Sequence, residues 1–199
     1  MDQGSNRQDM KGRESGMPEK ELWEQFFNPE EVLKVMGLSE HVRDVAEFGC
    51  GYGTFTIPAA RIVKGAVFAF DIESEIVAAT QRVAEKNNLH NVKPLLRDFI
   101  KDDTGLEKES VDYVMLFNIL HIEHPEILLE ESHRILRRGG KLGIIHWNYD
   151  LATPRGPSMA IRPKPEQCIA WAETAGFSNP KQHDLPPYHY GIVLTREEI

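Results

Sequence analysis

The chain has 199 residues, of which 41% are apolar and 27% charged, which suits one domain with a packed core. Its formal net charge is −8, from 31 acidic against 23 basic residues, and this argues against a phosphate-backbone partner such as nucleic acid. No apolar run reaches the roughly 18 residues of a membrane span, no signal segment opens the chain, and two cysteines make no disulfide framework, so a cytoplasmic protein is expected.

The N-terminal part of the chain differs in composition from the rest. Residues 1–19 are polar and rich in charge, and we expect them to be disordered or to act as a mobile lid before a single domain over residues 20–199. An apolar patch follows at Leu22, Trp23, Phe26 and Phe27. Asn28 and Pro29 then predict a helix start, because a capping side chain precedes a proline in the first turn. The buried face of this helix is expected at Val32, Leu33, Val35 and Met36.

From Val42 onward, apolar segments alternate with amphipathic ones. Strands are expected at Val42–Phe48, Ala66–Phe70, Val92–Leu96, Val111–Phe117 and Lys141–Trp147. Helices are expected at Thr54–Val63, Ser74–Asn87, Pro125–Arg137 and Pro165–Ala175, the last two closing on Gly139 and Gly176. This order predicts a parallel sheet with right-handed crossovers. Two final strands, Lys181–Leu185 and His189–Arg196, lie too close together for a helical crossover and should be antiparallel.

A glycine-rich turn after the first strand is the most informative segment. In Gly49-Cys50-Gly51-Tyr52-Gly53, glycines at alternate positions permit positive φ and close approach of a ligand to the backbone. The following helix would point its free N–H groups at that ligand. Asp71 ends the next apolar run, 22 positions after Gly49 (71 − 49), where a carboxylate can accept hydrogen bonds from a ribose diol. These features predict a nucleotide-type pocket.

The spacing of this turn distinguishes between nucleotide-binding families. Thr54 stands where a dinucleotide fingerprint has its third glycine, and Gly53 comes one position early. An acid at Glu47, one residue, and then Gly-x-Gly-x-Gly resembles the class I S-adenosylmethionine-dependent methyltransferases. The resemblance runs from about Glu30 to the C-terminus. It implies a three-layer, doubly wound α/β fold with a mostly parallel seven-stranded sheet, strand order 3-2-1-4-5-7-6, and an antiparallel C-terminal strand.

The resemblance also implies the cofactor, S-adenosylmethionine, and its product, S-adenosylhomocysteine. Glu47 would complement the α-ammonium group, the glycines would let the backbone approach the methionine and ribose, and Asp71 would accept both ribose hydroxyls. Asp98 would accept from the adenine amino group, with Ile72 and Phe99 beside the ring. The implied cofactor residues are Glu47, Phe48, Gly49, Cys50, Gly51, Gly53, Asp71, Ile72, Asp98, Phe99, Phe117 and Asn118.

Histidines at the strand ends are candidates for acid–base chemistry. Methyl transfer needs alignment above all, and a general base only where the acceptor must lose a proton. His121 and His146 are the catalytic candidates, and surface or helix-capping histidines are the alternative. His124 adds a third imidazole, but no cysteine or well-spaced acid completes a metal set. Residues expected at the substrate are Trp23, Phe27, His121, Trp147 and Tyr149, with the insertion Asn148–Lys164 as a wall.

The segment Arg134–Gly140 resembles the one before strand five in small-molecule and quinone-type methyltransferases, with its arginines on a solvated helix end. A small-molecule acceptor is therefore expected. Two alternatives remain. The glycine spacing, Glu47 and the terminal hairpin argue against a nicotinamide-dependent oxidoreductase. The second alternative is a methyltransferase-like binding protein without turnover. Intact cofactor residues do not distinguish it from an active enzyme, since both would bind the cofactor.

Overall fold

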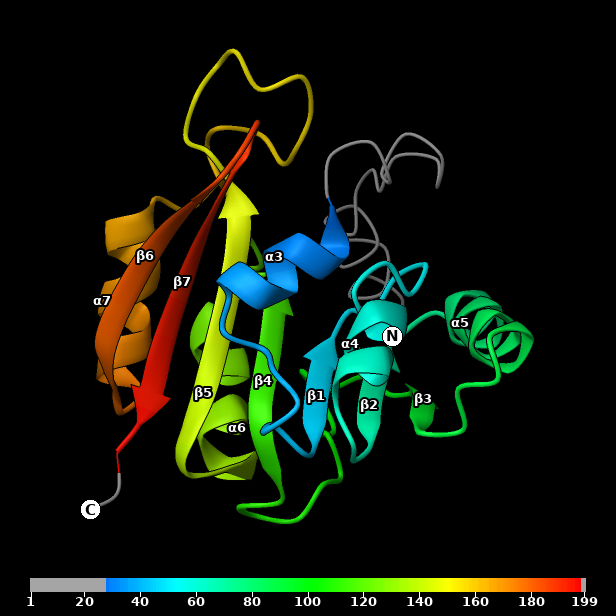
Figure 1. Ribbon diagram of the computed structural model, residues 1–199. Helices are drawn as coiled ribbons and strands as arrows, with labels where there is room; N and C mark the ends of the chain where they lie inside the picture. Colours follow the sequence, from blue (N-terminus) through cyan, green and yellow to red (C-terminus); the bar gives the residue numbers. More distant parts are fainter. Residues whose placement is uncertain (1–27, 198–199) are drawn as a thin grey trace, which may run out of the picture.

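A mixed β-sheet forms the middle layer of the protein, with strand order β3-β2-β1-β4-β5-β7-β6 (Figure 1). The computed structural model describes residues 28–197. The first five strands pair in parallel, and β7 runs antiparallel to both β5 and β6. The predicted seven-strand order and antiparallel end of the sheet are confirmed. The strands are β1 (Val45–Phe48), β2 (Val67–Asp71), β3 (Val92–Leu96), β4 (Val111–Phe117), β5 (Leu136–Trp147), β6 (Phe177–Leu185) and β7 (His189–Arg196).

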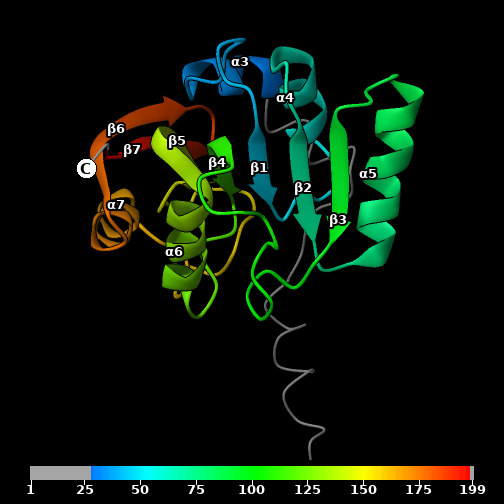
Figure 2. The same cartoon turned by 90° about the horizontal axis from the view of Figure 1, so that it is seen from below.

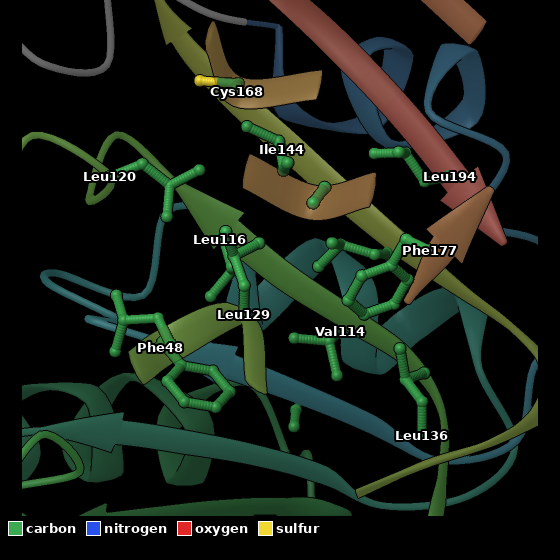
Figure 3. Close-up of a cluster of buried hydrophobic side chains, with 14 of the residues drawn as sticks. Phe48, Val114, Leu116, Leu120, Leu129, Leu136, Ile144, Cys168, Phe177 and Leu194 are labelled. Carbon is green, nitrogen blue, oxygen red and sulfur yellow. The ribbon is translucent and has the colours of Figure 1, made fainter. Parts of the chain in front are cut away.

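Helices cover both faces of the sheet, which makes the fold three-layered (Figure 2). One core cluster joins the sheet to α3 (Pro29–Val35), α4 (Thr56–Ile62) and α5 (Ser74–Lys86). The other joins it to α6 (Pro125–Ile135) and α7 (Pro165–Thr174). Figure 3 shows side chains of this second cluster, where Phe48 of β1 and Leu129 of α6 both lie. None of the helices in residues 28–197 is long and apolar enough to cross a membrane.

Two predictions about the N-terminal part can be compared with the structure. The Asn28 side chain accepts a hydrogen bond from the Glu31 N–H at 3.4 Å, as expected of a helix cap. Val35, predicted on the buried face, is instead 41% exposed. Residues 1–19, the boundary at residue 20, and the side chains of Leu22, Trp23, Phe26 and Phe27 lie outside the described residues.

The prediction that the helix from Pro125 ends at Arg137 and closes on Gly139 is wrong. Helix α6 ends at Ile135, and β5 begins at once with Leu136. Between the pairs Val111–Leu136 and Tyr113–Lys141 the register shifts, so the four residues 137–140 bulge opposite Asp112 alone. Gly139 takes a φ of +75° inside this bulge.

The bulge brings the Arg137 side chain to the starts of β1 and β4. The Arg137 guanidinium lies 2.7 Å from the Asp112 carboxylate and 3.3 Å from that of Asp44. It also donates to the Ser110 carbonyl oxygen at 2.6 Å. Arg137 therefore clamps the starts of β1 and β4, and does not lie on a solvated helix end. The same clamp delays the start of β1 to Val45, since the Arg43 and Asp44 N–H groups donate to the Asp112 carboxylate.

Gly143 of β5 lies against the ring of Tyr113 on the neighbouring strand. A Cβ added to Gly143 would come 2.3 Å from the Tyr113 hydroxyl oxygen. The ring cannot move aside, because Tyr113 is fully buried and its hydroxyl donates to the Met36 carbonyl oxygen at 2.8 Å. Only a residue without a side chain fits this position.

We expect Gly143→Ala to lower the free energy of unfolding by about 3 kcal/mol, the upper part of the usual overpacking range. Gly37→Ala is the control, because a Cβ there meets nothing within 4 Å although φ is +79°. That variant carries only the backbone cost of about 1–2 kcal/mol. Urea denaturation measures both, and a smaller loss for Gly143→Ala than for Gly37→Ala would contradict the packing argument.

Candidate functional site

A cavity of about 560 Å³ opens where β1, β2 and β4 end. Its wall contains the tips of these strands, the turn after β3 and part of the segment after β5. A volume of this size suits a small molecule held at the carboxyl edge of a parallel sheet. The predicted cofactor residues on the wall are Glu47, Gly49, Cys50, Gly51, Asp71, Ile72, Asp98, Phe99, Phe117 and Asn118.

Two residues of the predicted cofactor set lie off this wall. The Phe48 side chain belongs to the core, with its ring centroid 5.9 Å from that of Phe70 and 5.1 Å from that of Phe99. Its direction follows from strand alternation, because Glu47 faces the opposite side of β1. Gly53 has a φ of +78°, and a Cβ there would meet Ile57 and Thr80 at 3.4 Å. Gly53 thus serves the turn and its packing, not the cavity surface.

The Asp71 carboxylate is fixed by the glycine turn. Its Oδ2 accepts the Gly51 N–H at 3.1 Å, and its Oδ1 accepts the Glu73 N–H at 3.1 Å. The Thr80 hydroxyl donates to the Gly51 carbonyl oxygen at 2.9 Å and so holds the turn from the other side. Burial raises the pKa of Asp71 despite these hydrogen bonds. Each carboxylate oxygen keeps acceptor capacity for a ligand hydroxyl.

Glu47 is a second carboxyl group on the wall, and it is far more enclosed. It is 2% exposed, and the described residues bring it a hydrogen bond from the Thr56 hydroxyl. Burial raises the pKa of Glu47 to about 8, with a smaller contribution from the nearby Asp71. A carboxyl group in such surroundings favours a cationic partner, because a charge of opposite sign offsets the cost of ionising it there.

Two polar side chains on the wall lack partners within residues 28–197. Both amide atoms of Asn118 are buried without a hydrogen bond, and so is the Thr54 hydroxyl oxygen. Asn118 has a φ of +56°, an uncommon conformation outside glycine. Buried polar groups are nearly always paired in folded proteins. These atoms, with Glu47 and Asp71, fit a ligand that is cationic at one end and rich in hydrogen-bonding groups.

The candidate histidines come together from neighbouring strands. His121 follows β4 and lies on the cavity wall, whereas His146 in β5 is fully buried behind it. His121 Nδ1 and His146 Nε2 are 3.3 Å apart. Burial lowers the pKa of His121 to about 4 and holds that of His146 well below its ordinary value. Across residues 28–197, no cluster of three or more metal-binding side chains is found.

The residues predicted to contact the substrate do not all lie on the cavity wall. Trp147 lies on the wall. Tyr149 does not line the cavity and is 45% exposed, with the Lys164 Nζ 4.7 Å from its ring centroid. Trp23 and Phe27 lie outside the described residues.

The predicted insertion does reach the cavity, through Arg155, Gly156 and Pro157. Arg162 organises this cap, because its guanidinium donates to the Pro157 carbonyl oxygen at 2.8 Å and to that of Asn148 at 3.0 Å. The proline-rich insertion signalled a wall, but no local pattern indicated which of its residues face the cavity. Other wall residues that the sequence analysis missed are Tyr52, Thr54, Phe55, Glu73, Ile76, Ile100, Ile119, Ile122 and Glu123.

Comparison with known proteins identifies the class. Residues 45–140 match a family described as a methyltransferase domain. The solved structure of a SAM-dependent methyltransferase from Aquifex aeolicus is 27% identical, with a TM-score of 0.78 over 86% of this chain and 91% of that one. A geranyl diphosphate methyltransferase in complex with SAM shares the fold at 15% identity, with a TM-score of 0.71 over 91% of this chain and 93% of that one.

A curated relative, the tRNA/tmRNA (uracil-C(5))-methyltransferase of Helicobacter hepaticus, is 34% identical over 68 residues, which are 34% of this chain and 17% of that protein. The chain spans between 17% and 58% of the length of the curated relatives it matches. Residues 45–140 therefore form a methyltransferase domain, and the chain shares the class I, Rossmann-like fold of S-adenosylmethionine-dependent methyltransferases. The predicted family is confirmed, and with it S-adenosylmethionine as the cofactor.

Proposed function

We propose that this protein transfers a methyl group from S-adenosylmethionine to a small-molecule acceptor in the cytoplasm. The observation that supports this most strongly is the cavity itself, where the buried Glu47, the half-buried Asp71 and the Asn118 amide, unpaired within residues 28–197, share one wall. When bound, the cofactor supplies an activated methyl group on a sulfonium. The protein must therefore align the acceptor and exclude water.

The proposed cofactor roles are supported by the places of Glu47, Asp71, Asp98 and Asn118 on the cavity wall. Glu47, whose buried carboxyl group ionises at a cost that a cation offsets, pairs with the α-ammonium group. Asp71, held by the Gly51 and Glu73 N–H groups, accepts the ribose hydroxyls. Asp98 accepts from the adenine amino group between Ile72 and Phe99. Asn118 at the tip of β4 completes the polar contacts near the methionine portion.

Apolar side chains form much of the cavity wall that is left for the acceptor. Phe55, Phe117, Ile119 and Trp147 line it, and the cap reaches over it with Gly156 and Pro157. An enclosed apolar wall suits a small molecule better than an RNA strand, which calls for basic surface. The net charge of −8 agrees with this.

A two-stage experiment tests the proposal. Calorimetric titration with S-adenosylhomocysteine and with NAD comes first, and we expect heat with the former only. A methyl-release assay then compares a metabolite panel with bulk tRNA, because one curated relative acts on tRNA. Release with tRNA alone would contradict a small-molecule acceptor. Tight S-adenosylhomocysteine binding without any turnover would indicate a binding protein.

Asp71→Ala is expected to weaken S-adenosylhomocysteine binding by about 1.5–3 kcal/mol, roughly 10- to 150-fold, the usual value of hydrogen bonds to a charged group. The fold should persist, since Asp71 caps a turn and is not part of a core cluster. Asp102→Ala is the matched control, because Asp102 is exposed and does not line the cavity. Calorimetry measures both affinities, and an unchanged Kd for Asp71→Ala would refute the ribose assignment.

A further inference from the structure

The proton positions of the pair His121 and His146 follow from one backbone group. The Trp147 N–H donates to His146 Nδ1 at 3.0 Å. A backbone N–H is always a donor, so His146 Nδ1 must offer a lone pair. Burial, with the neighbouring His121, His189 and Arg162, depresses the pKa of His146, and its ring is therefore neutral. The single proton of this ring lies on Nε2.

The same reasoning extends to the second ring. His146 Nε2 lies 3.3 Å from His121 Nδ1, and because Nε2 holds the proton, His121 Nδ1 is the acceptor. Burial keeps the pKa of His121 near 4, so this ring is also neutral at pH 7. Its proton must then lie on Nε2, at the ring edge turned away from His146.

This arrangement changes what His121 can do at the cavity. His121 lines the wall, yet its lone pair is engaged by His146, and the edge away from that partner holds an N–H. A ring in this state donates a hydrogen bond and does not remove a proton. His121 in this state cannot take a proton from an acceptor, but it can donate a hydrogen bond to an acceptor oxygen that is already ionised.

A cation lies on the same wall. Arg155 reaches the cavity from the cap, which Arg162 fastens through five acceptor groups of the segment 148–157. Glu123 and His124 also line this side, and His124 Nδ1 lies 2.9 Å from the Glu126 carboxylate. An arginine and an imidazole N–H that line the same cavity both favour an oxyanion as the ligand group.

We propose that His121 is a substrate-binding hydrogen-bond donor, held in its Nε2–H tautomer by His146 and the Trp147 N–H, and that the methyl acceptor bears an anionic oxygen bound by this N–H. His146 is the positioning residue. The identity of the acceptor class rests on the proposed function, but the tautomer of the pair does not.

The tautomers can be read without cofactor or substrate. Long-range ¹H–¹⁵N correlation spectra of protein labelled with ¹⁵N-histidine distinguish Nδ1–H from Nε2–H rings. We expect Nε2–H for both residues at pH 7, with signals assigned from His121→Gln and His146→Gln. An Nδ1–H or doubly protonated ring at either position would overturn the proposal.

A titration tests the acceptor class. The protein is first saturated with S-adenosylhomocysteine, and benzoate or its neutral isostere benzamide is then added as the titrant. Benzoate should bind at least about tenfold more tightly, because its hydrogen bonds are charge-assisted. His121→Phe should remove most of this preference, and His90→Phe, an exposed histidine off the wall, should retain it. Equal binding of the two probes, no benzoate binding, or an unchanged preference in His121→Phe would overturn the anionic-oxygen assignment. Failure of S-adenosylhomocysteine to bind would count against the proposed function, with the tautomer still decided by the spectra.

Discussion

Glu47→Gln is expected to weaken S-adenosylmethionine binding at pH 8 by at least about 30-fold, since truncating one partner of a buried charge pair costs roughly 2–5 kcal/mol. Glu47 is 2% exposed, so little water would screen the proposed interaction of its carboxylate with the α-ammonium group. Gln keeps the size of the side chain and can still accept the Thr56 hydrogen bond, which isolates the charge.

The same variant should lose the pH dependence of binding. Burial raises the pKa of Glu47 to about 8, so below that pH the ligand-free carboxyl holds a proton that the cation must displace. The wild-type Kd should fall by about tenfold per pH unit between pH 6 and 7.5, with release of about one proton. Calorimetry in two buffers of different ionisation enthalpy measures this proton. Glu107→Gln, at an exposed position off the wall, is the control, and equal proton release in wild type and Glu47→Gln would contradict the ammonium assignment.

Glu47 should also cost stability in the ligand-free protein. Its pKa rises from 4.5 to about 8 on folding. Glu47 therefore does not lower the free energy of unfolding below pH 4.5, but lowers it progressively as the pH rises toward 8. The free energy of unfolding should fall by about 1.4 kcal/mol per pH unit in that window. Glu47→Gln should abolish this slope and be more stable than wild type at pH 8 in urea denaturation. A carboxyl group that weakens the ligand-free fold and strengthens binding is expected at a functional site.

Gly51→Val is the second substitution for which we expect a large effect, with S-adenosylhomocysteine binding weakened by more than about 150-fold, beyond the Asp71→Ala range. Gly51 has a φ of +52°, which a β-branched residue rarely adopts. Its N–H also holds Asp71 at 3.1 Å, so a change of φ displaces the carboxylate together with the backbone.

The backbone cost needs its own control. Gly105→Val places the same residue at a φ of +71°, away from the cavity and facing the flexible Arg97 side chain. Both variants should lose about 1–2 kcal/mol of unfolding free energy to the left-handed conformation. Only Gly51→Val should lose affinity in calorimetry. Normal binding by Gly51→Val would contradict the proposed geometry of the turn.

The parts of the site that sequence reasoning located depend on short segments. A glycine turn between a buried strand and a helix demands positive φ at fixed positions, and Gly49, Gly51 and Gly53 all have it. Asp71 lies at the end of the next parallel strand, so its place beside Gly51 follows from the strand order. Glu47 is on the wall because alternate residues of a strand face opposite sides, and the same alternation turns Phe48 into the core.

The errors arose where partners distant in the sequence decide the outcome. Arg137 lies in a helical pattern, yet Asp44 and Asp112 draw it into the clamp at the start of β5. Tyr149 is an aromatic residue next to the cavity in sequence, but Lys164 lies over its ring outside the wall. None of these three partners can be identified from the neighbouring residues alone.

The amino-acid sequence by itself determined the alternation of strands and helices, the glycine turn and the place of Asp71, because each follows from backbone conformation or strand periodicity within a few residues. The strand order and the role of Glu47 were expected from the family resemblance. Only the tertiary structure decided the register bulge at residues 137–140, the entry of Arg155 into the wall, and the contact between His121 and His146. These features need cross-strand register and cap packing, which depend on contacts between segments far apart in the chain.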